Sequence, residues 1–266
     1  MIRFKSLSSG SCGNCYFIGI FSEDGHCENS IVIDTGVSLR RAKKDLQRDN
    51  IAVEEIDAIL VTHDHNDHIR SLGSWCKRLK KPVWATATLH EALTSNYMVH
   101  PWISDCRRRL NDEGWTEIVP GRIRVHWFEV PHDATQTLGY AIDLDGYSFV
   151  IMTDIGEMTE EALEYASKAD TLVIEANYDY EMLRHGPYPE ILQDRICGGH
   201  GHLSNAQCAE AIQMAQHEGL DNIFLCHLSE HNNTPELALE ASSAALDSCG
   251  CNARVITLPR ESASPL

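Results

Sequence analysis

The sequence lacks the features of a membrane protein or an exported protein. No apolar run approaches the roughly 20 residues that a membrane-spanning helix needs. The N-terminal residues 1–5 alternate as in a strand and show no basic segment followed by an apolar one, so no export signal is expected. These absences predict a cytoplasmic protein that does not enter a membrane.

Positive charge is also scarce. The chain has 22 Lys and Arg residues against 39 Asp and Glu residues, a formal net charge of −17. Such a charge argues against diffuse binding to nucleic acid. However, 17 of the 22 cations lie in the first 150 residues, with basic runs at 40–44, 77–81, 107–109 and 122–124. We interpret most of these as solvated helix faces, with contact to a phosphate backbone as the alternative.

Cysteine pairs with the spacing of a complete zinc knuckle are missing. Cys12 and Cys15 form a C-x-x-C pair, but Cys249 and Cys251 are separated by only one residue and cannot supply the matching half. We interpret the C-x-x-C as part of a Gly-rich turn. In a chain of this length without an export signal, the ten cysteines are expected to be reduced.

The length and patterning predict one α/β domain that spans residues 1–266, without internal repeats. Apolar runs predict strands at 2–7, 16–21, 30–34, 56–62, 82–85, 123–130, 138–143, 147–153, 171–175, 222–226 and 254–258. Helical spacing and capping signals predict helices at 38–48, 68–80, 88–97, 159–167, 204–218 and 234–247. Residues 101–115 are expected to be an irregular elaboration that shapes substrate access.

Residue types that bind metals recur where predicted strands end. Three histidines and an aspartate lie within six residues, directly after the apolar strand at 56–62, and further histidines and acids follow later strands. Strand ends in a layered α/β fold meet in loops at one sheet edge, where sites are built. We therefore expect these side chains to line one cavity. They are His63, His65, Asp67, His68, His132, Asp154, Glu175 and His227.

This set of donors suits two divalent metal ions. Imidazoles and carboxylates bind zinc, manganese or iron, so the residues alone do not select the metal. Three histidines would hold one ion, and an aspartate with two histidines would hold a second, with a carboxylate between them. Two such ions about 3.5–4 Å apart lower the pKa of a bridging water. The alternative for each residue alone is a structural role, such as a helix cap for Asp67 or Asp154.

The residues His63 to His68 form an H-x-H-x-D-H motif that resembles the signature of the metallo-β-lactamase fold superfamily. The turn Asp34-Thr35-Gly36 is similar to the early Asp-Gly turn of that superfamily. The resemblance implies a four-layer αββα sandwich of two mixed β-sheets flanked by helices. It also implies ligand sets: His63, His65 and His132 for one metal, Asp67, His68 and His227 for the other, and Asp154 as the bridge.

Within the superfamily the chain most resembles the WalJ/YycJ-type exonuclease group. The similar segments are 6–16, 131–134, 175–179, 201–205, 227–229 and 232–233. The resemblance implies a 5′ exonuclease that acts on DNA, with single strands preferred, and that lacks the inserted β-CASP domain of ribonuclease J. The His200-Gly201-His202 stretch adds a second histidine whose role the resemblance does not assign.

The hypothesis from sequence is metal-assisted hydrolysis of a phosphodiester. Asp67 or Asp154 would hold the attacking water, and His202 would assist the leaving oxygen. Glu175 would contact the catalytic region or, alternatively, orient a metal-binding histidine. Asp67, His202 and Glu175 are thus the candidate catalytic residues.

Two other functions stay open at this point. The same core would serve a hydrolase of small molecules, such as a cyclic-phosphate phosphodiesterase, a lactonase or a thioesterase. A non-catalytic regulatory protein that keeps its metals for stability is the second alternative. The basic segments, with Trp102 or Trp115, favour single-stranded nucleic acid, which such residues hold by charge and stacking.

Overall fold

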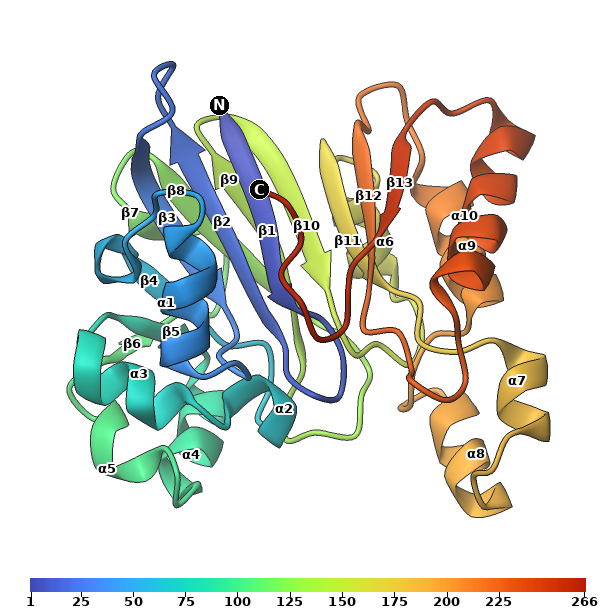
Figure 1. Ribbon diagram of the computed structural model, residues 1–266, viewed down its shortest axis with the longest axis horizontal. Coiled ribbons are helices and arrows are strands. Elements are labelled where there is room, and N and C mark those ends of the chain that lie inside the picture. The colour runs from blue at the N-terminus through green and yellow to red at the C-terminus, as the bar shows by residue number, and fades with distance from the viewer.

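Two β-sheets pack face to face in the computed structural model, which describes residues 1–266 (Figure 1). The first sheet has the order β1 (Ile2–Ser8), β2 (Cys15–Phe21), β3 (Cys27–Ile33), β4 (Ala58–Leu60), β5 (Val83–Ala85) and β6 (Arg107–Arg109). The second has the order β13 (Arg254–Thr257), β12 (Asn222–Cys226), β11 (Thr171–Glu175), β10 (Tyr147–Met152), β9 (Leu138–Leu144), β8 (Ile123–Glu129) and β7 (Thr116–Val119).

Both sheets are mixed, and each changes from antiparallel to parallel pairing along its width. In the first sheet β1, β2 and β3 pair antiparallel, whereas β3 to β6 pair parallel. In the second sheet β7 to β10 pair antiparallel, whereas β10 to β13 pair parallel. Parallel neighbours end at the same edge, so the loops after β10, β11 and β12 emerge together.

Helices cover the outer faces of the sheets (Figure 1). The helices of the chain are α1 (Leu39–Gln47), η1 (Val53–Glu55), α2 (Asn66–Ile69), α3 (Leu72–Leu79), α4 (Ala87–Ser95), α5 (His100–Ile103), α6 (Glu160–Ala166), α7 (Tyr180–His185), α8 (Glu190–Cys197), α9 (Asn205–Ala215) and α10 (Pro235–Cys249). Helices α1 and α3 to α5 lie beside the first sheet, and α6, α9 and α10 lie beside the second. The predicted four-layer αββα sandwich is confirmed.

The alternation of side chains along β10 shows how the layers are held together. Phe149 and Ile151 belong to the core that joins the two sheets, and the ring of Phe149 lies 5.2 Å from that of Phe4 in β1. Val150 and Met152 face the opposite way and pack in the core under α6, α9 and α10. Each such buried side chain contributes about 1.5–3 kcal/mol, so both faces of this strand require cover.

Several local predictions are confirmed. Strands β11 and β12 have the predicted bounds. The strands predicted at 138–143 and 147–153 are β9 and β10, which pair antiparallel around the turn at Asp145-Gly146. Ser204 forms a complete capping box at the start of α9, and Thr234 caps α10, whose first residue is a proline. In each case a short-range signal, a turn or a cap, fixes the element.

Other predictions need correction. The predicted helix at 68–80 is two helices, α2 and α3, because the backbone of Ser71 donates a hydrogen bond to Thr35 O (3.2 Å) instead of continuing α2. Residues 101–115, predicted to be irregular, contain most of α5 and all of β6. Strand β7 and helices α7 and α8 were not predicted. No helix combines the length and the apolar character that crossing a membrane requires.

Candidate metal centre

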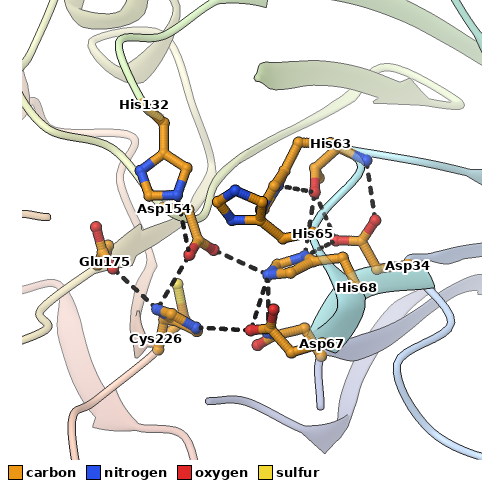
Figure 2. Close-up of polar contacts among 12 residues, drawn as sticks. Asp34, His63, His65, Asp67, His68, His132, Asp154, Glu175 and Cys226 are labelled. Carbon is orange, nitrogen blue, oxygen red and sulfur yellow. Dashed lines mark hydrogen bonds and ion pairs between the residues drawn. The ribbon is translucent and has the colours of Figure 1, made fainter. Parts of the chain in front are cut away.

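The seven predicted ligands lie close together, and Figure 2 labels all of them except His227. The segment after β4, which includes α2, carries four of them, and the segments after β8, β10 and β12 carry one each. In that order they are His63, His65, Asp67 and His68, then His132, Asp154 and His227. The structure therefore brings all seven into one site, although they span more than half of the chain.

The first group consists of three histidines. The ligand nitrogens of His63, His65 and His132 lie within 4.8 Å of one another. His63 is completely buried, and its Nε2 has no hydrogen-bond partner. A buried polar atom without a partner is costly, and three imidazole nitrogens at this separation have the donor type that divalent metals bind. This group fits the first predicted ion.

The second group consists of an aspartate and two histidines. The ligand atoms of Asp67, His68 and His227 also lie within 4.8 Å of one another. The Oδ2 atom of Asp67 is 3.4 Å from Nε2 of His227 and 3.5 Å from Nε2 of His68. The side chain of Asp67 keeps 22% of its surface exposed, so it can also reach a water molecule.

Asp154 lies between the two groups (Figure 2). Its Oδ2 is 3.1 Å from Nε2 of His68 in the second group, and its Oδ1 is 3.8 Å from Nε2 of His132 in the first. Oδ2 is buried and has no partner with hydrogen-bond geometry. A carboxylate in this position is able to share its oxygens between two ions, as the resemblance implied.

The nitrogens that face away from the centre are held by the protein. Nδ1 of His68 lies 2.7 Å from Asp34 Oδ2, and Nδ1 of His132 lies 2.8 Å from Gly201 O. The other oxygen of Asp34 accepts a hydrogen bond from the backbone of Thr62 (2.9 Å). With Nδ1 held outward, Nε2 of each ring faces the centre, which is the usual arrangement around metal-binding histidines.

Glu175 lies beneath the centre and is completely buried. Its Oε1 is 2.7 Å from Nδ1 of His202 and 3.0 Å from Nδ1 of His227, and its Oε2 accepts a hydrogen bond from the backbone of Ile155 (2.9 Å). The ligand atoms of Glu175, His202, His227 and Asp154 also form a compact group. The side chain of Asn177 also donates a hydrogen bond to Oε1 (3.2 Å). These contacts fit the alternative in which Glu175 orients the two histidines.

His202 borders the cavity with 21% of its side chain exposed. Burial opposes protonation of its ring, but the carboxylate of Glu175 outweighs burial and raises the pKa of His202. The protein engages Nδ1 and gives Nε2 no hydrogen-bond partner. His200 is exposed, which separates the two histidines of this stretch: only His202 reaches the site.

The electrostatics of the site favour cations. Burial lowers the pKa of His68, but Asp154, Asp34 and Asp67 together outweigh burial and raise it to about 10. Burial, with the neighbouring histidines, lowers the pKa of His63 well below its usual value, so this ring stays neutral and able to bind a metal. The acids of this buried centre thus favour a protonated His68, which indicates that the centre lacks positive charge. Divalent cations would supply this charge.

Three residues of the site have left-handed backbones. Asp34, Asp154 and His227 follow strands β3, β10 and β12 and have φ angles of 61°, 46° and 53°. Such conformations are uncommon for residues other than glycine and cost on the order of 1–3 kcal/mol each where they are sparsely populated. The turn at each strand end aims the side chain inward, so the surrounding fold holds the residue in this conformation.

A cavity of about 210 Å³ opens beside the centre. Arg195 of α8 is the only lysine or arginine that lines it, and its Nε donates to Oδ2 of Asp133 at 2.5 Å. The other oxygen of Asp133 lies 3.4 Å from Nε2 of His132 and 3.7 Å from Nε2 of His65. This ion pair therefore places a cation at the rim, next to the first group.

Sequence reasoning missed several residues around the centre. The amide of Asn14 lies 2.8 Å from Nε2 of His68 and 3.1 Å from Oδ2 of Asp67, yet the sequence marked it only as part of a turn. Asp34 was noted within a motif but received no role. Arg195 carried no signal, because the helix that presents it was not predicted.

Comparison with known proteins agrees with this fold. A family described as "Beta-lactamase superfamily domain" matches residues 29–227. The chain therefore belongs to the metallo-β-lactamase superfamily of hydrolases, as predicted. The family implies divalent metals, and the histidines and aspartates described above are the candidate ligands.

Two relatives and one solved structure illustrate the similarity. The chain is 32% identical to exodeoxyribonuclease WalJ of Streptococcus pneumoniae over 236 residues, 89% of this chain and 85% of that protein. It is 30% identical to exodeoxyribonuclease YycJ of Bacillus anthracis over 249 residues, 94% of this chain and 90% of that protein. Unliganded yeast PDE1 shares the fold with a TM-score of 0.73 and 13% identity, with all of both chains covered.

Proposed function

We propose that this protein is a metal-dependent phosphodiesterase that degrades DNA from the 5′ end, with single strands preferred. The observation that carries the proposal is the position of Asp154 between a three-histidine group and an Asp-His-His group, which provides for two ions. The identity of 30–32% to proteins named exodeoxyribonucleases supports DNA as the substrate.

The two ions would be zinc, manganese or iron, held by His63, His65 and His132 and by Asp67, His68 and His227, with Asp154 shared. When bound, they would lower the pKa of a water molecule and neutralise charge on the phosphate.

The remaining polar groups of the cavity have complementary tasks in this proposal. Asp67, partly exposed at the cavity, orients the attacking water and accepts its proton. His202, with its pKa raised by Glu175, donates a proton to the leaving oxygen. Arg195 binds a non-bridging phosphate oxygen at the rim, as guanidinium groups commonly do.

The test uses purified protein with its metal content measured and with zinc or manganese supplied separately. The substrates are 5′-phosphorylated single-stranded DNA labelled at either end and bis-p-nitrophenyl phosphate. We expect stepwise release of nucleotides from the 5′ end, and loss of that activity in a folded His65→Ala variant. Full activity of His65→Ala would contradict the proposed centre.

A second candidate is hydrolysis of a small phosphodiester, lactone or thioester. The small volume of the cavity and its single arginine favour it, as does the net charge of −17. Salt dependence separates the two candidates, because binding of a polynucleotide weakens steeply as salt rises and binding of a small monoanion does not. Turnover of the small diester with no release of nucleotides would select this second candidate.

A further inference from the structure

Positive charge is concentrated in one part of the molecule outside the candidate metal centre. Residues 77–109 contain seven lysines and arginines but only two acids, in a chain whose net charge is −17. We call six of these cations the basic edge: Lys77, Arg78, Lys80, Lys81, Arg107 and Arg108. All are exposed except Lys81, which is half-buried.

The fold joins the two basic runs of the sequence into one surface. Strand β6, which carries Arg107 and Arg108, is the last strand of the first sheet and pairs with β5. Lys80 and Lys81 lie just before β5, and Arg107 is in register with Val83 of that strand. Figure 1 shows α3, α4, α5 and β6 together at one corner of the molecule.

The basic edge differs from the basic run at 122–124 because acids do not neutralise it. Arg122 is paired with Asp145 and Glu28, and Arg124 is paired with Asp143. None of the six cations of the basic edge forms an ion pair; in β6 only Arg109 does, with Asp112. The charge of this surface is therefore available to an anionic partner.

Exposed aromatic rings lie on the same surface. Trp102 is 41% exposed and Tyr97 is 83% exposed, both in the segment of α4 and α5. Lys77 reaches across from α3, with its Nζ 4.2 Å from the ring centroid of Trp102. Arginines on an edge strand alone would be explained as protection against pairing with another sheet. That explanation does not account for the lysines of α3 or for the exposed rings.

Helix α3 connects the segment of the candidate metal centre to the basic edge. Helix α3 begins at Leu72, four residues after His68, and its eight residues extend about 12 Å toward the lysines at its end. Stacked nucleotides rise about 3.4 Å each along a strand, so on the order of four nucleotides would bridge this distance. Cations together with exposed aromatic rings are the features that hold single strands without sequence preference.

We infer that the basic edge binds the uncleaved part of a single-stranded polynucleotide whose end lies at the metal centre. This inference rests on the proposed function and narrows it to substrates longer than about four nucleotides. It gives the negatively charged protein a local surface for a polyanion. The negative charge of the rest of the protein repels a polyanion, so a bound strand should follow the basic edge.

The test compares two charge-reversed variants with the same change in net charge. Arg107→Glu/Arg108→Glu alters the basic edge. Arg40→Glu/Lys44→Glu is the matched control, because both residues are exposed, lack ion pairs and lie on α1. Binding is measured by fluorescence anisotropy with a labelled 20-nucleotide single strand that has phosphorothioate linkages, and turnover is measured with bis-p-nitrophenyl phosphate.

We expect Arg107→Glu/Arg108→Glu to weaken binding of the 20-mer by about tenfold or more at 0.1 M salt. Each lost phosphate contact reduces the slope of log K against log salt by about 0.7, so the slope should fall by about 1.4. The control should change binding less than about twofold, and neither variant should alter turnover of the small diester. Trp102→Ala should weaken binding of the 20-mer without a change in this slope.

Equal loss of binding in both charge-reversed variants would overturn the inference, as would unchanged binding in Arg107→Glu/Arg108→Glu. Because the binding measurement does not require hydrolysis, its failure is distinct from failure of the proposed function. A protein that binds the 20-mer through the basic edge but hydrolyses no diester would refute the proposed activity and leave the binding surface intact.

Discussion

The Oδ2 atom of Asp34 lies 2.7 Å from Nδ1 of His68, and both side chains are completely buried. Asp34 lies in the loop after β3 and His68 lies in α2, so this contact fixes the loop against the helix. It also determines which nitrogen of His68 faces the metal centre. Asp34 had no role assigned from the sequence, and this contact gives it a role at the centre that can be tested.

We predict that Asp34→Asn weakens metal binding about 10- to 100-fold, as is typical when the partner of a metal-binding histidine is altered. The amide still fits the space but can present its NH₂ group to His68 and disturb the ring orientation. Metal affinity is measured by competition with a chelator. Asp57→Asn is the control, because Asp57 accepts a hydrogen bond from the backbone of Ser30 outside the site. Equal metal affinity in wild type and Asp34→Asn would refute this role.

His202 and His227 share the carboxylate of Glu175 but should behave differently when altered. We predict that His202→Asn lowers kcat about 10²- to 10⁴-fold and retains bound metal, because His202 is assigned a proton transfer and not a ligand position. His227→Asn should lose metal as well as activity. The measurement pairs metal analysis with steady-state kinetics. Loss of metal from His202→Asn would instead favour the compact group of Asp154, Glu175, His202 and His227 as a ligand set.

The sequence predicts an element well where neighbouring residues determine it, and poorly where contacts between residues far apart in the sequence determine it. The hairpin at Asp145-Gly146 and the cap at Ser204 are local, and both were predicted with nearly correct bounds. Strand β6 has the sequence Arg-Arg-Arg, which no hydrophobic pattern marks. It is a strand because it pairs with the edge of β5, a contact across more than twenty residues. The interpretation of the chain as one domain stays a prediction.

In the site, too, some features could be predicted from the sequence and others depend on contacts between distant residues. The ligand candidates were recognisable because their types and order are distinctive, and the structure places them together. The roles of Glu175 and Asp34 depend on which atoms they face, and those contacts join residues 27 and 34 positions apart. Spacing alone therefore left open whether Glu175 touches the substrate or orients a histidine, and its complete burial supports the second.

Arg195 provides a prediction about substrate binding. As the only lysine or arginine that lines the cavity, it should contribute mainly to affinity for an anionic diester. A hydrogen bond to a charged group contributes about 1.5–3 kcal/mol, so Arg195→Gln should raise KM about 10- to 100-fold with a smaller change in kcat. Arg184→Gln is the control, because Arg184 pairs with Asp194 and does not line the cavity. A change confined to kcat would contradict a binding role.

Gly36 makes the closest approach between the loop after β3 and the helix of the motif. A Cβ atom at this position would lie 1.7 Å from the carbonyl oxygen of Asp67, and the backbone of Gly36 already donates to Asn14 O at 2.8 Å. Alanine there must push α2 away. We therefore expect Gly36→Ala to lower the free energy of unfolding by about 3 kcal/mol, at the upper end of typical overpacking costs, and to weaken metal binding.

The matched substitution is Gly199→Ala, where the nearest atom to an added Cβ is Oε2 of Glu157 at 3.4 Å, an ordinary contact. Urea unfolding of both variants, each with and without metal, separates the two effects. If Gly36→Ala displaces the ligands of α2, it should lose most of the stabilisation that metal gives the wild type, because a ligand stabilises the folded state according to its affinity. A Gly36→Ala protein as stable and as metal-responsive as Gly199→Ala would show that α2 can move without cost to the centre.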